Sequence, residues 1–424
     1  MKSSMKKLEL AASGKLAWKR LSRTDVLVID EISMMENHHF ERLNKIMRHA
    51  LKPDKPFGGV QLIAIGDFCQ LPPVKPFQYC ITCGMTLEIS PRGDRYTCPN
   101  DMCHGQEYLN IDKWAFRSNA WQEADFVHVN LTTIHRQKDS VLKALLEKSR
   151  IGIPWSQSEK QLLLNHPSDT KDAVKLFPTR GDVKAVNDRE FARLKTRQVD
   201  FHCYDEFRWN REREELRGKD RRSQYDGSLL ALKDHRFDVD VNFKEGMLVV
   251  LMINLDLKEG LVNGSQGVIC GFKNHADAII PHEGRNKDAE PSRVHKMKDE
   301  CITKFKKQAR EPQWPVVRFF NGLEKVILAE CTVNQLGDSK PYSLLSRTQI
   351  PLSAAWAMTV HKSQGMTLSR VEVDLSKSFE YGQAYVALSR ARTLEGLRVT
   401  RLPRQDQGAN RQVREFLRDK FNIT

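Results

Sequence analysis

Two short apolar runs, each with an acidic residue within two positions of its end, constrain the fold of this chain more than any other feature. The aliphatic run Val26–Ile29 ends in Asp30 and Glu31, and the run Val60–Ile65 is followed by a glycine and Asp67. Continuous β-branched and aliphatic runs of this length predict strands that are buried on both faces of a parallel sheet.

The segment between the two runs has a helical pattern. Phe40, Leu43, Met47 and Leu51 recur at helical spacing, and Pro53 ends the pattern. A strand, a helix and a second strand, with acidic residues at the strand ends, are typical of a doubly wound α/β domain. Ligands of such domains bind at the carboxyl ends of the strands.

The same alternation returns later in the chain, which predicts a second α/β domain. Residues 174–177 and 371–375 have the composition of buried strands, and residues 382–392 favour a helix. We therefore expect a first domain over residues 1–130 and a second over residues 131–424.

A change of character within the second domain predicts an inserted β module over about residues 243–335. Short apolar runs with glycine turns occupy residues 246–272, and two more candidate strands are residues 316–320 and 325–331. This pattern favours a small β-barrel or β-hairpin module. The polar stretch 273–313 is expected to be a loop-like insertion.

The charge of the chain favours a polyanionic partner. Its 68 lysines and arginines exceed its 54 aspartates and glutamates, which leaves a formal charge of +14. Such an excess attracts nucleic acid and raises its encounter rate. Residues 201–236 are the most crowded with charge, and we expect a solvated helix or loop there. No apolar run reaches the roughly 18–20 residues that span a bilayer, and the N-terminus does not resemble a signal peptide, so a membrane partner is not expected.

Four of the nine cysteines lie in one insertion, residues 77–110, where the apolar periodicity disappears. They form two pairs, separated by fourteen residues, with the spacing of a tetrahedral structural Zn²⁺ site: Cys80, Cys83, Cys98 and Cys103. Reduced thiols without metal, or disulfides, are the alternatives, and His104 could replace Cys103 as a ligand. Because nine cysteines are too few for a disulfide scaffold in a chain of this length, a reducing compartment is expected.

Polar residues after the strands have the chemistry needed to hydrolyse a nucleoside triphosphate. Asp30 could hold Mg²⁺ while Glu31 orients or deprotonates the attacking water, and Gln70 could sense the γ-phosphate. The acidic pair could instead belong to the cap of a following helix, and the segment around Gln70 could be only a rigid turn. Arg390, near the C-terminus, could stabilise charge on a transferred phosphate.

Several stretches together resemble the helicases of superfamily one, specifically the PIF (petite integration frequency) group of ATP-dependent DNA helicases. In chain order they are LVIDEISMM, GDFCQLPPV, LTTIHRQ, LFPTRGDVKAVND, GLVNGSQGV, QIPLSAAWAMTVHKSQGMTL and YVALSRAR. They run in family order from about residue 25 to residue 400.

The resemblance implies two RecA-like α/β domains and a set of residue roles. Asp30 would coordinate Mg²⁺, Glu31 would activate water, and Gln70 would couple the γ-phosphate to movement. Arg136 and Arg390 would reach the phosphates from the second domain. The residues implied to bind ATP are Asp30, Gln70, Gly365 and Arg390.

The resemblance also implies a DNA contact. The residues that would couple DNA to the nucleotide site are Thr359, His361, Lys362, Ser363 and Gln364. The stretch GLVNGSQGV would belong to a β-barrel insertion that lies over the DNA channel. The cysteine insertion is not part of the family's common core, so no role carries over to it.

One departure from the family pattern limits the expected activity. The family's Gly-rich loop ending in Gly-Lys-Ser/Thr is absent, and Gly14-Lys15 is followed by Leu16, so it is not a copy of that loop. We expect a first domain truncated at its N-terminal side, and weak or no ATP hydrolysis by this polypeptide alone. The competing interpretation is a fragment of an active enzyme.

The sequence thus predicts an ATP-dependent DNA helicase of genome maintenance, repair and recombination that acts on single-stranded or forked DNA. The alternatives are a non-hydrolysing nucleic-acid-binding remnant with a zinc ribbon, and an RNA helicase of the same superfamily. We expect an intracellular location, in the nucleus rather than the mitochondrion.

Overall fold

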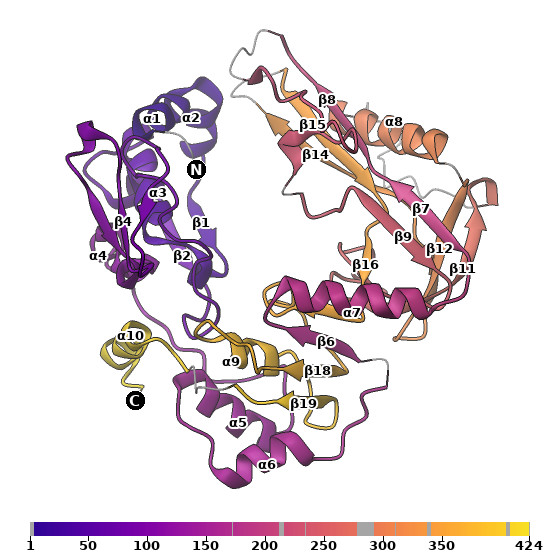
Figure 1. The fold of residues 1–424 in the computed structure, drawn as a ribbon. Coiled ribbons are helices and arrows are strands. Elements are labelled where there is room, and N and C mark those ends of the chain that lie inside the picture. Colours follow the sequence, from indigo (N-terminus) through magenta and orange to yellow (C-terminus); the bar gives the residue numbers. More distant parts are fainter. Residues whose placement is uncertain are drawn as a thin grey trace. The chain divides into compact units, whose positions relative to one another are not determined.

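The computed structural model, drawn in Figure 1, describes residues 4–171, 173–211, 216–233, 235–277, 292–309, 311–336, 341–403 and 408–423. The chain divides into two compact units. Unit 1 contains residues 1–169 and 373–424, and unit 2 contains residues 170–372. The sequence-based boundary at residue 130 stays a prediction. In the part of the chain that the structure describes, no helix has both the length and the apolar surface needed to cross a bilayer.

Unit 1 combines helices with short strands. The helices are α1 (Met5–Ser13), α2 (Lys15–Leu21), α3 (Asn37–Ala50), α4 (Asn119–Glu123), α5 (Ser140–Ile151), α6 (Gln157–Asn165), α9 (Gln383–Leu388) and α10 (Arg411–Phe421). The strands are β1 (Val26–Ile29), β2 (Gln61–Ala64), β3 (Glu88–Ile89), β4 (Arg95–Thr97), β5 (Glu107–Leu109) and β19 (Leu397–Arg401). The predicted strands and intervening helix near the N-terminus are therefore confirmed.

Strands β1 and β2 are parallel and in register from the pair Val26 and Gln61 to the pair Ile29 and Ala64. Helix α3 lies beside them (Figure 1), and its Phe40 and Met47 enter an apolar cluster to which both strands contribute. The other face of the strands is open, since the side chains of Val28 and Ile63 are 54% and 40% exposed. The expectation that both faces are buried was therefore wrong. A continuous apolar run does not specify how many faces are covered.

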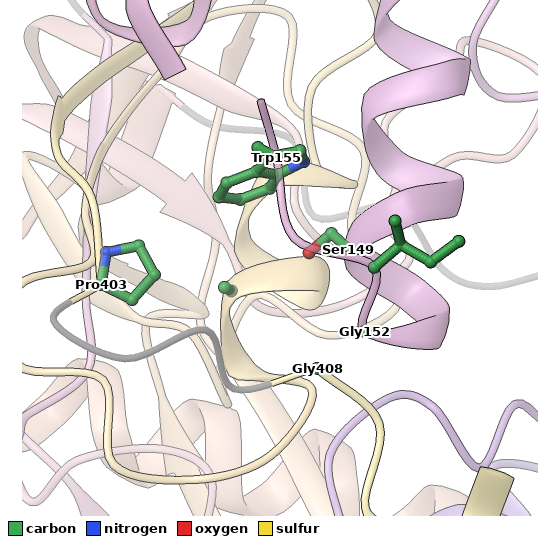
Figure 2. A pocket seen from close by; sticks show the side chains of 7 residues that line it. Ser149, Gly152, Trp155, Pro403 and Gly408 are labelled. Atoms are coloured by element: carbon green, nitrogen blue, oxygen red, sulfur yellow. The ribbon is translucent and has the colours of Figure 1, made fainter. Parts of the chain in front are cut away.

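The C-terminal part of unit 1 packs closely on α5. At the end of α5, Gly152 has φ +82°, and a Cβ on Gly408 would lie 2.0 Å from the Gly152 Cα atom. Figure 2 shows the two glycines beside a small pocket that Ser149, Trp155 and Pro403 also line. Two chain segments touch backbone to backbone here, which only residues without a Cβ allow.

Unit 2 is dominated by antiparallel strands. Its helices are α7 (Arg180–Arg193) and α8 (Arg293–Gln308). Its strands are β6 (Val174–Phe177), β7 (Gln198–His202), β8 (Tyr204–Arg208), β9 (Asp240–Lys244), β10 (Leu248–Leu251), β11 (Gln266–Asn274), β12 (Gln313–Phe319), β13 (Glu324–Val326), β14 (Glu330–Leu336), β15 (Ser343–Gln349), β16 (Leu352–Ala354) and β17 (Ala357–Thr359), while β18 (Val371–Asp374) crosses the boundary between the units.

The sheets of unit 2 contain the predicted strands of the insertion. One sheet has the open order β13-β12-β11-β10-β16, another has the order β14-β15-β8, and β7 pairs with β9. All these pairings are antiparallel, whereas β17 and β6 are parallel. Closure of the insertion into a barrel stays a prediction.

Two segments expected to be loop-like contain regular structure. Helix α8 lies within residues 273–313, alongside β14, β15 and β8 (Figure 1), and it buries Met297, Cys301 and Phe305. Within residues 201–236 the chain forms β8, and residues 212–215 and 234 lie outside the described part. In α8 a narrow apolar stripe, spaced by four residues, is enough to bury a helix that is otherwise charged.

Candidate functional site

The carboxylate pair lies at the carboxyl end of β1, as predicted. The Glu31 backbone has the left-handed conformation φ 51°, ψ 46°, and its N–H donates to Asp30 Oδ1 over 2.8 Å. The Ile65 N–H donates to the Ile29 carbonyl over 2.8 Å, so the ends of β1 and β2 are joined directly before the pair. A non-glycine residue in this conformation is uncommon and can mark a functional site.

Gln70 lies in the loop that follows β2. Its N–H donates to the Asp67 carbonyl over 2.9 Å, and the Cys69 N–H donates to Asp67 Oδ1 over 3.1 Å. Arg150 of α5 binds the same carboxylate with two hydrogen bonds, from Nε to Oδ2 over 3.0 Å and from Nη2 to Oδ1 over 3.1 Å. The Asp67 side chain therefore organises the loop that carries Gln70.

The two predicted arginines come together in unit 1. Arg390 is 1% exposed, and its guanidinium donates to the Val386 carbonyl and to Ser389 Oγ, each over 2.8 Å. Arg136 donates from Nη1 to the Ser389 carbonyl over 3.3 Å. Two guanidinium groups are thus held around one turn of backbone.

Electrostatics connect these arginines with Glu31. Burial and the charge of Arg136 lower the pKa of Arg390 to about 10, while Tyr385 and Glu31 act in the opposite direction. Burial lowers the pKa of Arg136 as well, and the same two residues partly raise it again. Two desolvated cations that repel each other, with a carboxylate close enough to act on both, form a site that favours an anion.

The basic motif predicted to contact DNA lies in unit 2, directly after β17. Thr359 and Ser363 are buried, and Lys362 is exposed. Thr359 Oγ1 accepts from the Lys362 N–H over 3.2 Å, and Ser363 Oγ donates to the Val360 carbonyl over 2.8 Å. The hydroxyl groups therefore hold a tight turn.

The rest of this motif lies at the surface of the turn. His361 and Gln364 are half-buried, and Gly365 is exposed with φ +77°. The next residue, Met366, meets the turn between β10 and β11, since its Cγ is 3.2 Å from the position of a Cβ on Gly264. Two stretches that are far apart in the sequence, GLVNGSQGV and HKSQGM, therefore pack together.

The four predicted cysteines form one cluster. The ligand atoms of Cys80, Cys83, Cys98 and Cys103 all lie within 4.8 Å of one another. The sulfurs of Cys80 and Cys103 are 3.9 Å apart, and those of Cys83 and Cys98 are 3.6 Å apart. Burial opposes ionisation of Cys83, but hydrogen bonds from the Met85 backbone and Asn100 contribute to lowering its pKa to about 6.

The cysteine insertion is anchored on α3, the helix that follows the carboxylate pair. Arg42 is 2% exposed and donates from Nη2 to the Cys80 carbonyl over 2.5 Å, and Glu36 Oε2 accepts from the Phe77 N–H over 2.6 Å. The His38 ring packs edge-on against Phe77 and Tyr108. The N-cap residue and the first two turns of α3 therefore bind the insertion.

Sequence reasoning missed four residues that organise the site: Asp67, Gln137, Arg150 and Tyr385. Asp67 and Gln137 lie within matched motifs, and a strand-end aspartate was a usable signal. Tyr385 opens the matched stretch YVALSRAR, whereas Arg150 gave no signal, because an arginine on an amphipathic helix is an ordinary residue.

The fold and the site define a class before any relative is considered. The first of two parallel strands ends in a carboxylate pair, and the buried Arg390 and the half-buried Arg136 both respond to the charge of Glu31 in that pair. This arrangement is typical of α/β proteins that bind nucleoside triphosphates.

Comparison with known proteins gives the family. Residues 2–80 match the family described as PIF1-like helicase, and residues 319–416 match a second family described as helicase. The chain is 33% identical over 398 residues to ATP-dependent DNA helicase PIF1 of Xenopus laevis, covering 92% of this chain and 48% of the relative. It is 34% identical over 380 residues to the Homo sapiens protein of that name, covering 88% and 45%. The chain belongs to the PIF1-like helicases and spans about half the length of these curated relatives.

Solved structures agree with this assignment. The Pif1 helicase of Candida albicans has a TM-score of 0.68 and 28% identity, over 98% of this chain and 82% of that chain. Bacteroides Pif1 in complex with ADP-AlF4 has a TM-score of 0.63 and 21% identity, over 96% and 78%, which speaks for the fold alone. The α/β helicase fold is therefore established.

Proposed function

We propose that this chain carries the ATP-hydrolysing residues and a DNA-binding part of an ATP-dependent DNA helicase of genome maintenance. The observation that carries the proposal is that Arg136 and the buried Arg390 are held around one turn of backbone, with Glu31 close enough to act on both. Curated relatives similar over most of the chain are ATP-dependent DNA helicases, and solved Pif1 structures include one bound to single-stranded DNA and one with forked DNA. Single-stranded or forked DNA is therefore the proposed partner.

Each residue of the site has a proposed role. Asp30 holds Mg²⁺, and Glu31 accepts the proton of the attacking water. Arg136 and Arg390 bind the terminal phosphate and stabilise its charge as it is transferred. Gln70 couples that phosphate to movement of its loop. The position of the buried Arg390 beside the half-buried Arg136 supports these roles, because their mutual repulsion is relieved when an anion binds.

The motif in unit 2 completes the proposal. We assign DNA contact and its coupling to the nucleotide to five residues, and nucleotide contact to Gly365. The five residues are Thr359, His361, Lys362, Ser363 and Gln364. The exposure of Lys362 supports binding of the phosphate backbone, with an affinity that falls as salt rises. Two RecA-like domains and a closed β-barrel insertion are part of the same proposal.

The 424 residues contain no Gly-rich loop that ends in Gly-Lys-Ser/Thr. Backbone amides and a lysine from such a loop hold the phosphates of ATP. We therefore propose that the chain taken alone turns ATP over slowly. This favours a second candidate function, a nucleic-acid-binding protein without ATP turnover.

Binding measurements test the nucleotide site without requiring turnover. A fluorescent, non-hydrolysable ATP analogue with Mg²⁺ is titrated into the chain in the presence of an oligo-dT strand. We expect Arg390→Ala and Arg136→Ala each to weaken binding at least about tenfold, which corresponds to about 1.4 kcal/mol. Arg189→Ala, at an exposed arginine of α7, is the matched control. Equal affinity in all four proteins would refute the site. Strong DNA-stimulated ATP turnover that is lost in Glu31→Gln would refute our proposal that the chain alone hydrolyses ATP slowly. It would support the proposed helicase function.

We propose that the cysteine cluster binds one structural Zn²⁺. A Zn–S distance of about 2.3 Å places the sulfurs of a tetrahedral site roughly 3.8 Å apart, and two of the separations in the cluster are 3.9 Å and 3.6 Å. Metal analysis of protein purified without chelator should give one zinc per chain. Cys98→Ser should lower this value, whereas Cys270→Ser, outside the cluster, should not. Zinc well below one equivalent in the unaltered chain would refute the proposal.

The compartment is a separate proposal. We assign the chain to the nucleus rather than the mitochondrion, and imaging of the tagged protein tests this directly.

A further inference from the structure

The loop that carries Gln70 is held from one side by α5. We call residues 66–71 the Gln70 loop. The two hydrogen bonds from Arg150 to the Asp67 carboxylate involve side chains that are only 26% and 16% exposed. Bidentate arginine–carboxylate pairs fix orientation as well as distance.

The loop is held from another side by the start of α9. Gly382 precedes α9 with φ +71°, and a Cβ at this residue would lie 2.3 Å from the Cys69 carbonyl oxygen and 2.5 Å from that of Gln70. The α9 backbone therefore touches the loop backbone directly. Tyr385, in the same helix, is close enough for the Asp67 charge to raise the pKa of its hydroxyl group, after the larger effect of burial.

The same short helix leads to the arginine pair. Arg390 donates to the Val386 carbonyl in α9, and Tyr385 acts on the pKa of both Arg136 and Arg390. The contacts of the Gln70 loop and of the arginines therefore converge on one element six residues long.

We infer that Arg150 and Gly382 are positioning residues that fix Gln70 relative to the Arg136 and Arg390 pair. This inference rests on the proposed function, because Gln70 and the arginines are there assigned to one phosphate group. Arg150 fixes the loop through Asp67, and Gly382 lets α9 approach the loop closely enough to transmit its position. Neither residue touches the nucleotide in this role.

Two measurements on the intact chain test the inference. The first is hydrogen exchange at the amides of Cys69 and Gln70, which should become at least about tenfold faster in Arg150→Gln. The second compares affinity for MgADP plus aluminium fluoride with affinity for MgADP alone, by calorimetry. Arg150→Gln should lower the ratio of these affinities about tenfold and leave MgADP binding unchanged, because only the phosphate mimic needs the loop in place.

Three further variants separate positioning from general stability. Arg150→Lys keeps the charge but cannot form two hydrogen bonds to the carboxylate, so its effects on the exchange rates and on the affinity ratio should be smaller than those of Arg150→Gln. It replaces Arg150→Gln in both measurements if that variant does not fold. Gly382→Ala should show the same two effects as Arg150→Gln. Lys148→Gln removes another ion pair of α5, with Glu159 at 2.7 Å, and should change neither measurement.

The outcomes are distinguishable. Unchanged exchange in Arg150→Gln overturns the inference. Faster exchange with an unchanged affinity ratio also overturns it, since the ion pair of Arg150 and Asp67 would then only stabilise the loop. If the unaltered chain binds neither nucleotide state, the proposed nucleotide site fails, and the exchange rates alone decide whether Arg150 and Gly382 hold the loop.

Discussion

The buried amide of Gln137 donates from Nε2 to the Ser389 carbonyl oxygen over 2.9 Å. The same nitrogen donates to the Ala391 carbonyl over 2.7 Å, so the two backbone groups on either side of Arg390 share one donor. Arg136, the neighbour of Gln137, is thereby placed beside Arg390.

Replacing Gln137 by leucine should disturb the arginine pair as well as the fold. The substitution keeps the volume but leaves two buried carbonyl groups without this donor, which costs about 1–3 kcal/mol. We expect a corresponding loss in the free energy of unfolding, measured with urea, and weaker binding of the fluorescent ATP analogue. Gln412→Leu, on half-buried α10, is a matched control. Full stability with unimpaired nucleotide binding would contradict the role of Gln137.

The ion pair of Asp205 and Arg347 should be the most costly one to break in unit 2. Arg347 donates to both carboxylate oxygens, over 2.8 Å and 2.7 Å, and the side chains are only 1% and 2% exposed. Asp205→Ala would leave a buried guanidinium without its anion, and we expect a loss of about 3–5 kcal/mol in the free energy of unfolding.

The double variant Asp205→Leu with Arg347→Met should recover much of this loss, because no charge then remains buried. Asp188→Ala removes an exposed ion pair with Lys184 and should cost less than about 1 kcal/mol. Urea denaturation of the four proteins makes the comparison. If Asp205→Ala lost no more free energy of unfolding than Asp188→Ala, the burial of the Asp205 and Arg347 pair would not contribute to stability.

The sequence predicted the parts of the site that depend on local pattern. Carboxylates at a strand end and paired cysteines can be recognised from residue type and spacing. Glu31 and the four-cysteine cluster that contains Cys80 could therefore be predicted from the sequence. The roles of Arg136 and Arg390 came from the family resemblance. Arg150 could not be found, since it lies 83 positions after Asp67 in the sequence and meets it only in the folded chain. Likewise, the exposed face of Val28 depends on what covers the sheet, which the run itself does not encode.

Acid should destabilise unit 1 through His38. Burial, followed by the charge of Arg42, lowers the pKa of His38 from 6.5 to about 3. Between these values the unfolded chain binds a proton that the folded chain does not, so the contribution is fully present above pH 6.5 and is lost as pH falls toward 3. The loss amounts to at most about 5 kcal/mol.

His38→Phe keeps an aromatic ring between Phe77 and Tyr108 but cannot titrate. The difference in free energy of unfolding between this variant and the unaltered chain should therefore grow as the pH is lowered from 6.5. Loss of metal in acid affects both proteins and cancels in the difference. If the difference in free energy of unfolding did not depend on pH, His38 would bind its proton in the folded chain at the same pH as in the unfolded chain, which would contradict this prediction.

The contact of Gly152 with Gly408 should tolerate no side chain. A Cβ on Gly408 would lie 2.0 Å from the Gly152 Cα atom, and both partners are backbone, so no side chain can move aside. Gly408→Ala must separate the end of α5 from the C-terminal segment, and we expect a loss of at least about 1–3 kcal/mol in the free energy of unfolding. Gly181→Ala, in α7, meets nothing within 4 Å and should leave stability unchanged or raise it by up to about 1 kcal/mol. Thermal and urea unfolding of both variants measure the difference. If the two substitutions cost the same, the close approach in Figure 2 does not contribute to the stability of unit 1.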